Sequence, residues 1–130
     1  MGVDLVKDKD VLERAYNDPE GYTAQFNLNL LIRLNRELGT NFDLTAFEHR
    51  AFYDTTLRRI EMHLVSRRAQ SIRLGNELIR FAAGESIHTE SSYKYQPEGF
   101  QQLAASAGFA VRERWLDDKR WFGVFLFSGG

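Results

Sequence analysis

With 130 residues, the chain is long enough for one domain with a single hydrophobic core, or for part of a larger fold. Its 17 basic residues nearly balance its 18 acidic residues, which argues against a nucleic-acid-binding surface. Cysteine is absent, which excludes disulfides and thiolate metal sites, and no apolar run approaches the roughly 20 residues that cross a bilayer. We therefore expect a cytoplasmic protein that binds neither nucleic acid nor membrane.

The first segment has the pattern of a short strand followed by a helix. Residues 3–6 have the composition of the end of a buried strand, so either the strand is short or the chain starts inside a larger fold. Asp8 or Asp10 can cap a helix that continues to about Tyr16. The turn-forming residues 17–21 then end this helix.

The clearest helix of the sequence covers residues 23–38. Large apolar residues recur there every four positions, with Thr23 as the candidate cap and Gly39 as the stop. We expect this helix to be central to the core. Asn27 and Asn29 are unfavourable inside a helix, and they face either a pocket or water.

Alternating patterns in the middle of the chain predict a small antiparallel sheet. Its clearest strand is 59–66, where Ile60, Met62 and Leu64 share one face. Gly75 suggests a tight turn or bulge that divides the next run into two short strands. The expected segments are, in order, 48–54, 59–66, 71–81 and 84–95.

The last of these strands carries a carboxylate and a hydroxyl side by side. Alternation along the strand places Glu90 and Ser92 on one face. Thr89, Ser91 and Tyr93 then lie on the opposite face. An ionised carboxylate only accepts hydrogen bonds, while a hydroxyl donates and accepts, so the pair can hold both nitrogens of an imidazole or another polar ring. The alternative is a solvated edge strand rich in polar residues.

The C-terminal segment predicts a helix and a hairpin. A helix begins at Pro97 and stops at Gly108, and two strands follow at 109–116 and 120–127. The second strand is apolar almost throughout, which is typical of a strand buried on both faces of a layered sheet. This chain has too few elements to cover both of its faces.

The three histidines do not indicate a metal site. His49, His63 and His88 are separated by 14 and 25 residues and lack the spacing of a local metal motif. We interpret them as surface residues, or as core residues with satisfied hydrogen bonds, and expect no metal.

Five stretches, taken in order, resemble a known family: residues 2–8 with 15–18, 23–38, 46–49, 60–62 and 81–95. Together they resemble the C-terminal part of the histidine-specific, S-adenosylmethionine (SAM)-dependent methyltransferases. That family forms the trimethylated histidine betaine hercynine, in the first step of ergothioneine biosynthesis. The resemblance extends over essentially the whole chain.

The resemblance implies a parent protein with a class I Rossmann-like methyltransferase domain and a smaller α+β domain that binds the amino acid. We expect an α+β chain in which residues 1–93 form the substrate-binding domain, with its small antiparallel sheet. Residues 94–130 would be the last helix and hairpin of the methyltransferase sheet. The N-terminal cofactor-binding part would be missing, and no Gly-x-Gly-x-x-Gly motif occurs here, so the SAM site would lie mostly outside this chain.

The resemblance also assigns substrate-binding residues. It implies that Glu90 and Ser92 hold the substrate imidazole, that Tyr16 helps to bind the amino-acid end, and that Met62 forms the pocket wall beside the ring. Residue type alone would make Tyr16 an aromatic residue at a helix end and Met62 a core residue. No catalytic residue is expected, because a neutral amine attacks the sulfonium methyl in line and the protein mainly positions it.

The sequence thus predicts the C-terminal part of a histidine N-methyltransferase that is inactive alone, with a small amino-acid substrate. The alternative is a non-catalytic module that binds a small ligand or pairs with a separately encoded Rossmann partner. A homodimer formed by pairing of the apolar strand 121–127 with a second copy is a further alternative.

Overall fold

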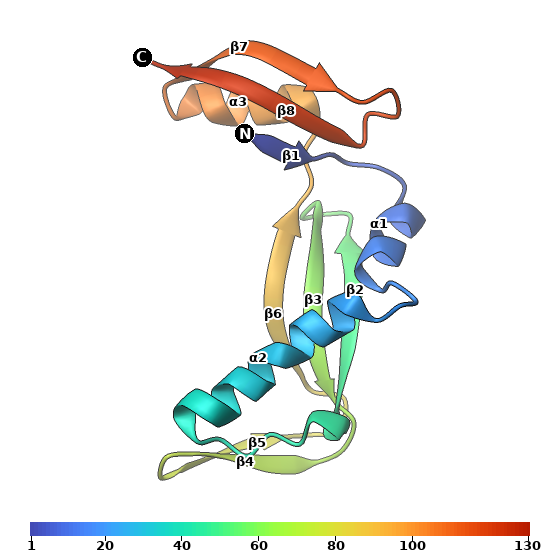
Figure 1. The fold of residues 1–130 in the computed structure, drawn as a ribbon, viewed down its shortest axis with the longest axis vertical. Coiled ribbons are helices and arrows are strands. Elements are labelled where there is room, and N and C mark those ends of the chain that lie inside the picture. The colour runs from blue at the N-terminus through green and yellow to red at the C-terminus, as the bar shows by residue number, and fades with distance from the viewer.

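The computed structural model describes all 130 residues, which form two units stacked along the long axis of the molecule (Figure 1). The lower unit contains the sheet β2-β3-β6, the hairpin β4-β5 and two helices, and the upper unit contains the sheet β1-β8-β7 and one helix. The elements are β1 (Gly2–Asp4), α1 (Lys9–Tyr16), α2 (Tyr22–Leu38), the 3₁₀ turn η1 (Leu44–Ala46), β2 (Phe47–Asp54), β3 (Arg59–Ser66), β4 (Gln70–Leu74), β5 (Glu77–Phe81), β6 (Ser86–Tyr93), α3 (Pro97–Ser106), β7 (Phe109–Leu116) and β8 (Phe122–Gly129). The predicted α+β class is confirmed. None of the helices is both long and apolar enough to span a lipid bilayer.

Strand β3 is the centre of the lower unit, antiparallel to β2 on one side and to β6 on the other. Its predicted apolar face is confirmed, since Ile60, Met62 and Leu64 are all buried. Ile60 and Met62 pack with Leu12 of α1, whereas Leu64 packs with Leu31 of α2. Both helices therefore cover the same face of the sheet.

Local signals fix the ends of both helices. Asp8 caps α1 by accepting a hydrogen bond from the Asp10 amide, as predicted. The predicted cap of α2 is wrong: the Asp18 carboxylate, not Thr23, accepts the amides of Tyr22 and Thr23. The helix ends at Gly39, whose positive φ of 64° suits glycine.

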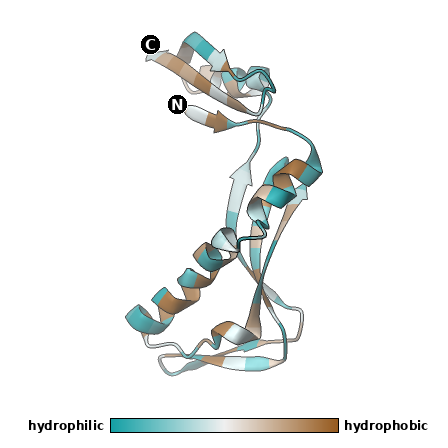
Figure 2. Cartoon of the chain, turned by 45° about the vertical axis from the view of Figure 1, so that its right-hand side comes forward, coloured by the Kyte–Doolittle hydropathy of each residue, from teal (hydrophilic) through white to brown (hydrophobic).

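Helix α2 is less central to the core than its apolar periodicity predicts. Only Asn27 and Leu31 are buried, and Phe26 is 66% exposed. Figure 2 shows hydrophobic and hydrophilic residues alternating along this helix. One part of its apolar stripe therefore packs on the sheet, and another part remains open beside it.

The hairpin β4-β5 differs from the single sheet that the sequence predicts. The two strands meet at a turn with Gly75 at φ 59°, as expected, but they form a separate two-stranded sheet. The hairpin contributes Ile72 to the core under α2.

Strand β6 contains an irregularity that strict alternation does not predict. Met62 pairs with Glu90 and His63 pairs with His88, so Thr89 is the extra residue of a bulge. The prediction that Thr89 lies on the opposite face from Glu90 is wrong, because both residues line the same hollow.

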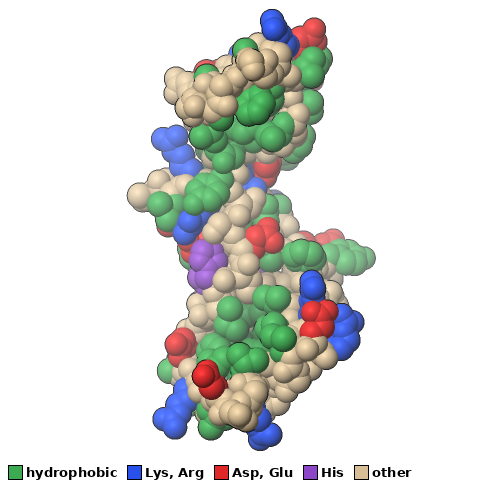
Figure 3. Space-filling model, turned by 90° about the vertical axis from the view of Figure 1, so that its left-hand side faces the viewer, with side chains coloured by type: hydrophobic (Ala, Val, Ile, Leu, Met, Phe, Trp, Pro, Cys, Tyr) green, Lys and Arg blue, Asp and Glu red, His purple; other side chains and the backbone are tan.

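In the upper unit, β8 lies between β1 and β7, and Phe100 of α3 packs against Phe125 on one face. The strand begins two residues later than predicted, because the amides of Trp121 and Phe122 donate to the Asp117 side chain in the connection. The other face carries partly exposed apolar side chains: Trp115, Phe122, Val124 and Leu126. Figure 3 shows hydrophobic side chains gathered at the surface of this unit.

The short strand β1 links the two ends of the chain. It comes from the first predicted domain, residues 1–93, but it pairs with β8 of the second, residues 94–130. Because the backbone of residues 1–5 already hydrogen-bonds to residues 121–125, a second copy could pair with this edge of the strand only beyond residue 125.

Candidate substrate-binding site

Two adjoining hollows open between the helices and the central sheet of the lower unit. Their volumes are about 360 and about 350 Å³, and they share Phe26, Met62 and Glu90. The first is also lined by Asn27, Asn29, Leu30, Arg33 and Thr89. The second is also lined by Ala15, Tyr16, Tyr22 and Thr23. The three shared residues therefore mark the middle of one continuous depression.

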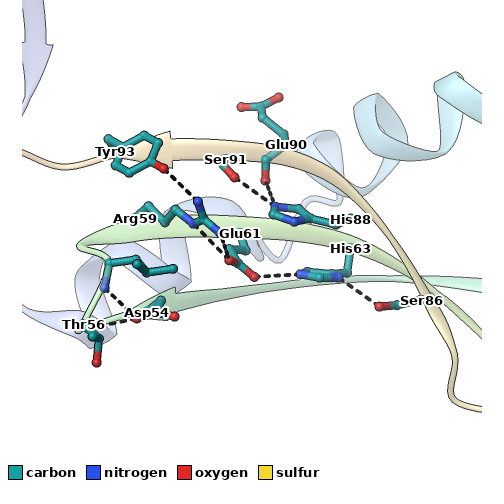
Figure 4. Close-up of polar contacts among 11 residues, drawn as sticks. Asp54, Thr56, Arg59, Glu61, His63, Ser86, His88, Glu90, Ser91 and Tyr93 are labelled. Atoms are coloured by element: carbon teal, nitrogen blue, oxygen red, sulfur yellow. Dashed lines mark hydrogen bonds and ion pairs between the residues drawn. The ribbon is translucent and has the colours of Figure 1, made fainter.

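Met62 and Glu90 lie opposite each other on the paired strands β3 and β6. Met62 is only 2% exposed and packs against α1, so it forms a fixed apolar wall. The Glu90 side chain is exposed and has no hydrogen-bond or ion-pair partner within the chain. Figure 4 shows its carboxylate projecting away from its own strand. The depression thus offers a free carboxylate beside an apolar surface.

Ser92 follows on the same strand and lies in a partly buried polar cluster. Its Oγ accepts a hydrogen bond from the Tyr16 hydroxyl at 3.0 Å and another from Lys94 Nζ at 3.0 Å. Lys94 also donates to the Tyr16 oxygen at 2.9 Å and pairs with Asp4 at 2.7 Å. The Lys94 side chain is fully buried, so all of its polar partners come from the protein.

The end of helix α1 is held firmly, which fixes the position of Tyr16. Asn17, the next residue, exchanges two hydrogen bonds with the backbone of Ala51 on β2. Buried Asn27 donates to His49 Nδ1 at 2.9 Å, so His49 carries its proton on Nε2 and donates it to the Tyr16 carbonyl at 2.8 Å. His49 is therefore a partly buried histidine with both ring nitrogens hydrogen-bonded, between the surface and core positions that the sequence allows.

The four predicted site residues come together in space. Tyr16, Met62 and Glu90 line one hollow, whereas Ser92 lines neither hollow and is linked to them by its hydrogen bond with Tyr16. The Tyr16 hydroxyl lies at the Ser92 end of the site, and its contact with the amino-acid end of a substrate stays a prediction. Asn27 and Asn29 both line the depression. Asn27 is itself buried, and its side-chain amide is engaged in a hydrogen bond with His49.

Sequence reasoning missed three residues of the site. Phe26 belongs to a helical apolar stripe and cannot be distinguished there from a core residue. Thr89 reaches the depression through the bulge, which depends on the pairing of β3 with β6. Lys94 is one of 17 basic residues, and no spacing pattern marks it as buried.

The opposite face of the sheet carries a second polar cluster (Figure 4). Glu61 accepts a hydrogen bond from His63 at 3.0 Å and from Arg59 at 2.6 Å, and these bonds, that of His63 first, hold the pKa of Glu61 below its ordinary value. His63 stacks on His88 with ring centroids 4.6 Å apart and ring planes 14° apart.

Potential ligand atoms of Glu61, His63 and His88 lie within 4.8 Å of one another. However, the lone pairs of a ring nitrogen lie in the ring plane, and those of two nearly parallel rings do not converge on one ion. Arg59 also occupies one oxygen of Glu61. The arrangement therefore favours an ion-pair and stacking cluster over a metal centre.

Comparison with known proteins adds an independent result. The family described as "Histidine-specific methyltransferase, SAM-dependent" matches residues 1–129. The "Histidine N-alpha-methyltransferase" of Mycolicibacterium smegmatis is 45% identical over 128 residues, which cover 97% of this chain and 40% of that protein. The protein of the same name from Mycobacterium tuberculosis is 43% identical over 128 residues, again 40% of its length. "Ergothioneine biosynthesis protein 1" of Schizosaccharomyces pombe is 25% identical over 103 residues, which cover 78% of this chain and 13% of that protein. The chain thus spans about two fifths of the first two relatives.

Proposed function

Because the chain belongs to the family of histidine-specific, SAM-dependent methyltransferases, we propose that it forms the ring-binding part of a histidine pocket. The complete enzyme would methylate the α-amino group of L-histidine and give hercynine. The observation that carries this proposal is the free Glu90 carboxylate beside Met62, with the Ser92 hydroxyl on the same strand.

These residues suit the edge of an imidazole ring. Glu90 accepts a hydrogen bond from the ring N–H, Ser92 contacts the other nitrogen, and Met62 packs against the ring. Each hollow, at about 350–360 Å³, lies near the small end of the range for ligand pockets, roughly 300–1,000 Å³.

SAM, the expected cofactor, is not matched by the residues of this chain. All three sheets are antiparallel, so no edge of parallel strands offers the crevice in which α/β folds bind such cofactors. No Gly-x-Gly-x-x-Gly loop occurs either. We therefore propose that the SAM site lies mostly outside this chain. Residues 1–93 would then act as the substrate domain, and residues 94–130 would complete the methyltransferase sheet.

The role of this chain in the reaction is to position the substrate. When bound, SAM supplies the methyl group, and Glu90 with its neighbours holds the ring so that the amine of histidine is correctly directed. Glu90 selects the ring and moves no proton. A site built for a hydrogen-bonding ring leaves its own polar groups unpaired when another ring enters, and this can discriminate by orders of magnitude.

The experiment that tests the proposal is a titration of the isotopically labelled chain with L-histidine, followed by backbone amide NMR. We expect saturable shifts around Met62 and Glu90 that are lost in Glu90→Ala. Glu77→Ala, which removes an exposed glutamate of β5 far from both hollows, is the matched control and should bind normally. Equal responses to histidine and tryptophan, or no saturable response to either, would contradict the proposal.

A further inference from the structure

Lys94 is the only fully buried cation of the structure, and all three of its ammonium protons have partners. They point to Asp4 Oδ2 at 2.7 Å, the Tyr16 hydroxyl at 2.9 Å and Ser92 Oγ at 3.0 Å. Its ammonium nitrogen also lies 4.8 Å from the centre of the Tyr16 ring. A buried charge with so complete a set of partners holds those partners in one arrangement.

The hydrogen-bond count around Ser92 then determines what its hydroxyl can do. A hydroxyl has one proton to donate and two lone pairs that accept. Both lone pairs of Ser92 are used, since Oγ accepts from Tyr16 and from Lys94. Its own proton has no acceptor within the chain. Ser92 itself lines neither hollow, but its proton is the one left to donate toward a ligand in the depression beside Glu90 and Tyr16.

Asp4 keeps the charge of Lys94 balanced. Partial burial alone would raise the pKa of Asp4, but hydrogen bonds from Lys7 and Lys94 outweigh it, so the pKa lies below its ordinary value. Asp4 is thus a carboxylate at neutral pH. Because Asp4 belongs to β1, the same ion pair ties the ring-binding cluster to the sheet of the upper unit.

We propose that Lys94 is a positioning residue of the histidine pocket: together with the Tyr16 hydroxyl it occupies both lone pairs of Ser92 and leaves Ser92 as a hydrogen-bond donor, so that the site takes the neutral imidazole and rejects the imidazolium. The inference rests on the proposed function. A neutral imidazole has one N–H for Glu90 and one bare nitrogen for Ser92. An imidazolium has two N–H groups. The second would point at the Ser92 hydroxyl proton, so two donors would face each other and no hydrogen bond would form.

The arrangement of Lys94 and Ser92 reverses the pH dependence of histidine binding that Glu90 alone would produce. A lone carboxylate attracts the cationic ring, so a pocket with Glu90 only would bind histidine better as the pH falls below the ring pKa of about 6.5. With Ser92 held as a donor, the neutral ring is preferred instead. Binding should then weaken about tenfold for each pH unit below the ring pKa.

Six other ionisable groups lie near the site. They are Asp4 from β1, Tyr16 from α1, Tyr22 and Arg33 from α2, His49 from β2 and Glu90 from β6. Of these residue types, only histidine ordinarily titrates between about pH 5 and pH 8. A His49→Gln variant therefore separates the titration of His49 from that of the ligand.

The first test uses the unmodified chain and L-histidine labelled with ¹⁵N in the ring. Between about pH 5 and pH 8, we expect the bound ring to show one protonated and one bare nitrogen, and the Kd to rise as the pH falls. A bound ring with both nitrogens protonated, or a Kd that falls on acidification, overturns the role of Lys94 but leaves the histidine pocket intact. No binding at any pH overturns the proposed function and this inference with it.

The second test is a double-mutant cycle with Lys94→Met and Ser92→Ala. If Lys94 acts through Ser92, Lys94→Met flattens the dependence of the Kd on pH and has no further effect when Ser92 is already alanine. Dispersed amide spectra show which variants are folded. If Lys94→Met is unfolded, the ¹⁵N experiment on the unmodified chain tests the role of Lys94 by itself. Independent effects on the Kd, with an unchanged pH dependence in Lys94→Met, would contradict the proposal.

Discussion

The hydroxyl groups of Tyr16 and Ser92 lie 3.0 Å apart, although 76 residues separate them in the sequence. This bond joins the end of α1 to β6, the strand that also carries Glu90. The position of the proposed ring-binding residues therefore depends on how α1 packs on the sheet. A change that loosens the end of α1 should disturb the site without touching Glu90.

We expect Tyr16→Phe to weaken histidine binding about two- to tenfold, because it removes one hydrogen bond of moderate strength from the Ser92 oxygen and one acceptor of the buried Lys94 ammonium. The ring stays over Lys94, so the packing changes little. Isothermal titration with L-histidine measures the effect. Tyr53→Phe is the control, since the hydroxyl of this buried tyrosine has no partner in the chain. Equal losses in both variants would contradict a specific role for the Tyr16 hydroxyl.

Asn27 is expected to contribute to stability far more than Asn29. Asn27 is buried and donates to His49 and to the His63 carbonyl, so Asn27→Ala takes the donor from two partly buried acceptors and should cost about 1–3 kcal/mol. Asn29 is exposed on the same helix, and Asn29→Ala should change stability by less than about 0.5 kcal/mol. Urea unfolding of the two variants measures the difference. Similar free energies of unfolding would show that the bonds of Asn27 add little.

The elements that the sequence predicts well are those with local causes. Asp8 caps α1 by accepting the amide of Asp10, two residues on. Gly39 ends α2 because its own backbone is left-handed, and the faces of β3 follow from strict alternation. Each of these signals lies within a few residues of its effect. Glu90 and Ser92 share one face for the same local reason.

The features that the sequence did not predict depend on distant partners. The bulge at Thr89 exists only because β6 pairs with β3. Lys94 is buried by Asp4 and Tyr16, which lie 90 and 78 residues away in sequence. Periodicity cannot report contacts of this kind, because it describes one segment at a time.

Glu90→Ala should change which ring the site prefers. Loss of the carboxylate removes a charged hydrogen bond to the imidazole, worth about 1.5–3 kcal/mol, so histidine binding should weaken about 10- to 150-fold. The cleared space next to Met62 and Phe26 should at the same time admit larger apolar rings. Competition between histidine and tryptophan in one NMR sample measures the ratio. An unchanged preference for histidine would exclude Glu90 as the selector of the ring.

Glu61 should make the stability of the lower unit sensitive to acid. Its folded-state pKa lies below the ordinary value of 4.5, because His63 and Arg59 hydrogen-bond to its ionised form. A lowered pKa means that the stabilisation is fully present above pH 4.5 and is lost as the pH falls through the folded-state pKa.

Glu61→Gln removes this ionisation. Its melting temperature should therefore be lower than that of the unmodified chain at neutral pH and should approach it as the pH falls below that value. Thermal unfolding of both proteins from neutral pH down into the acidic range measures this. A constant difference in melting temperature across that range would mean that Glu61 stabilises the sheet through contacts that do not depend on its charge.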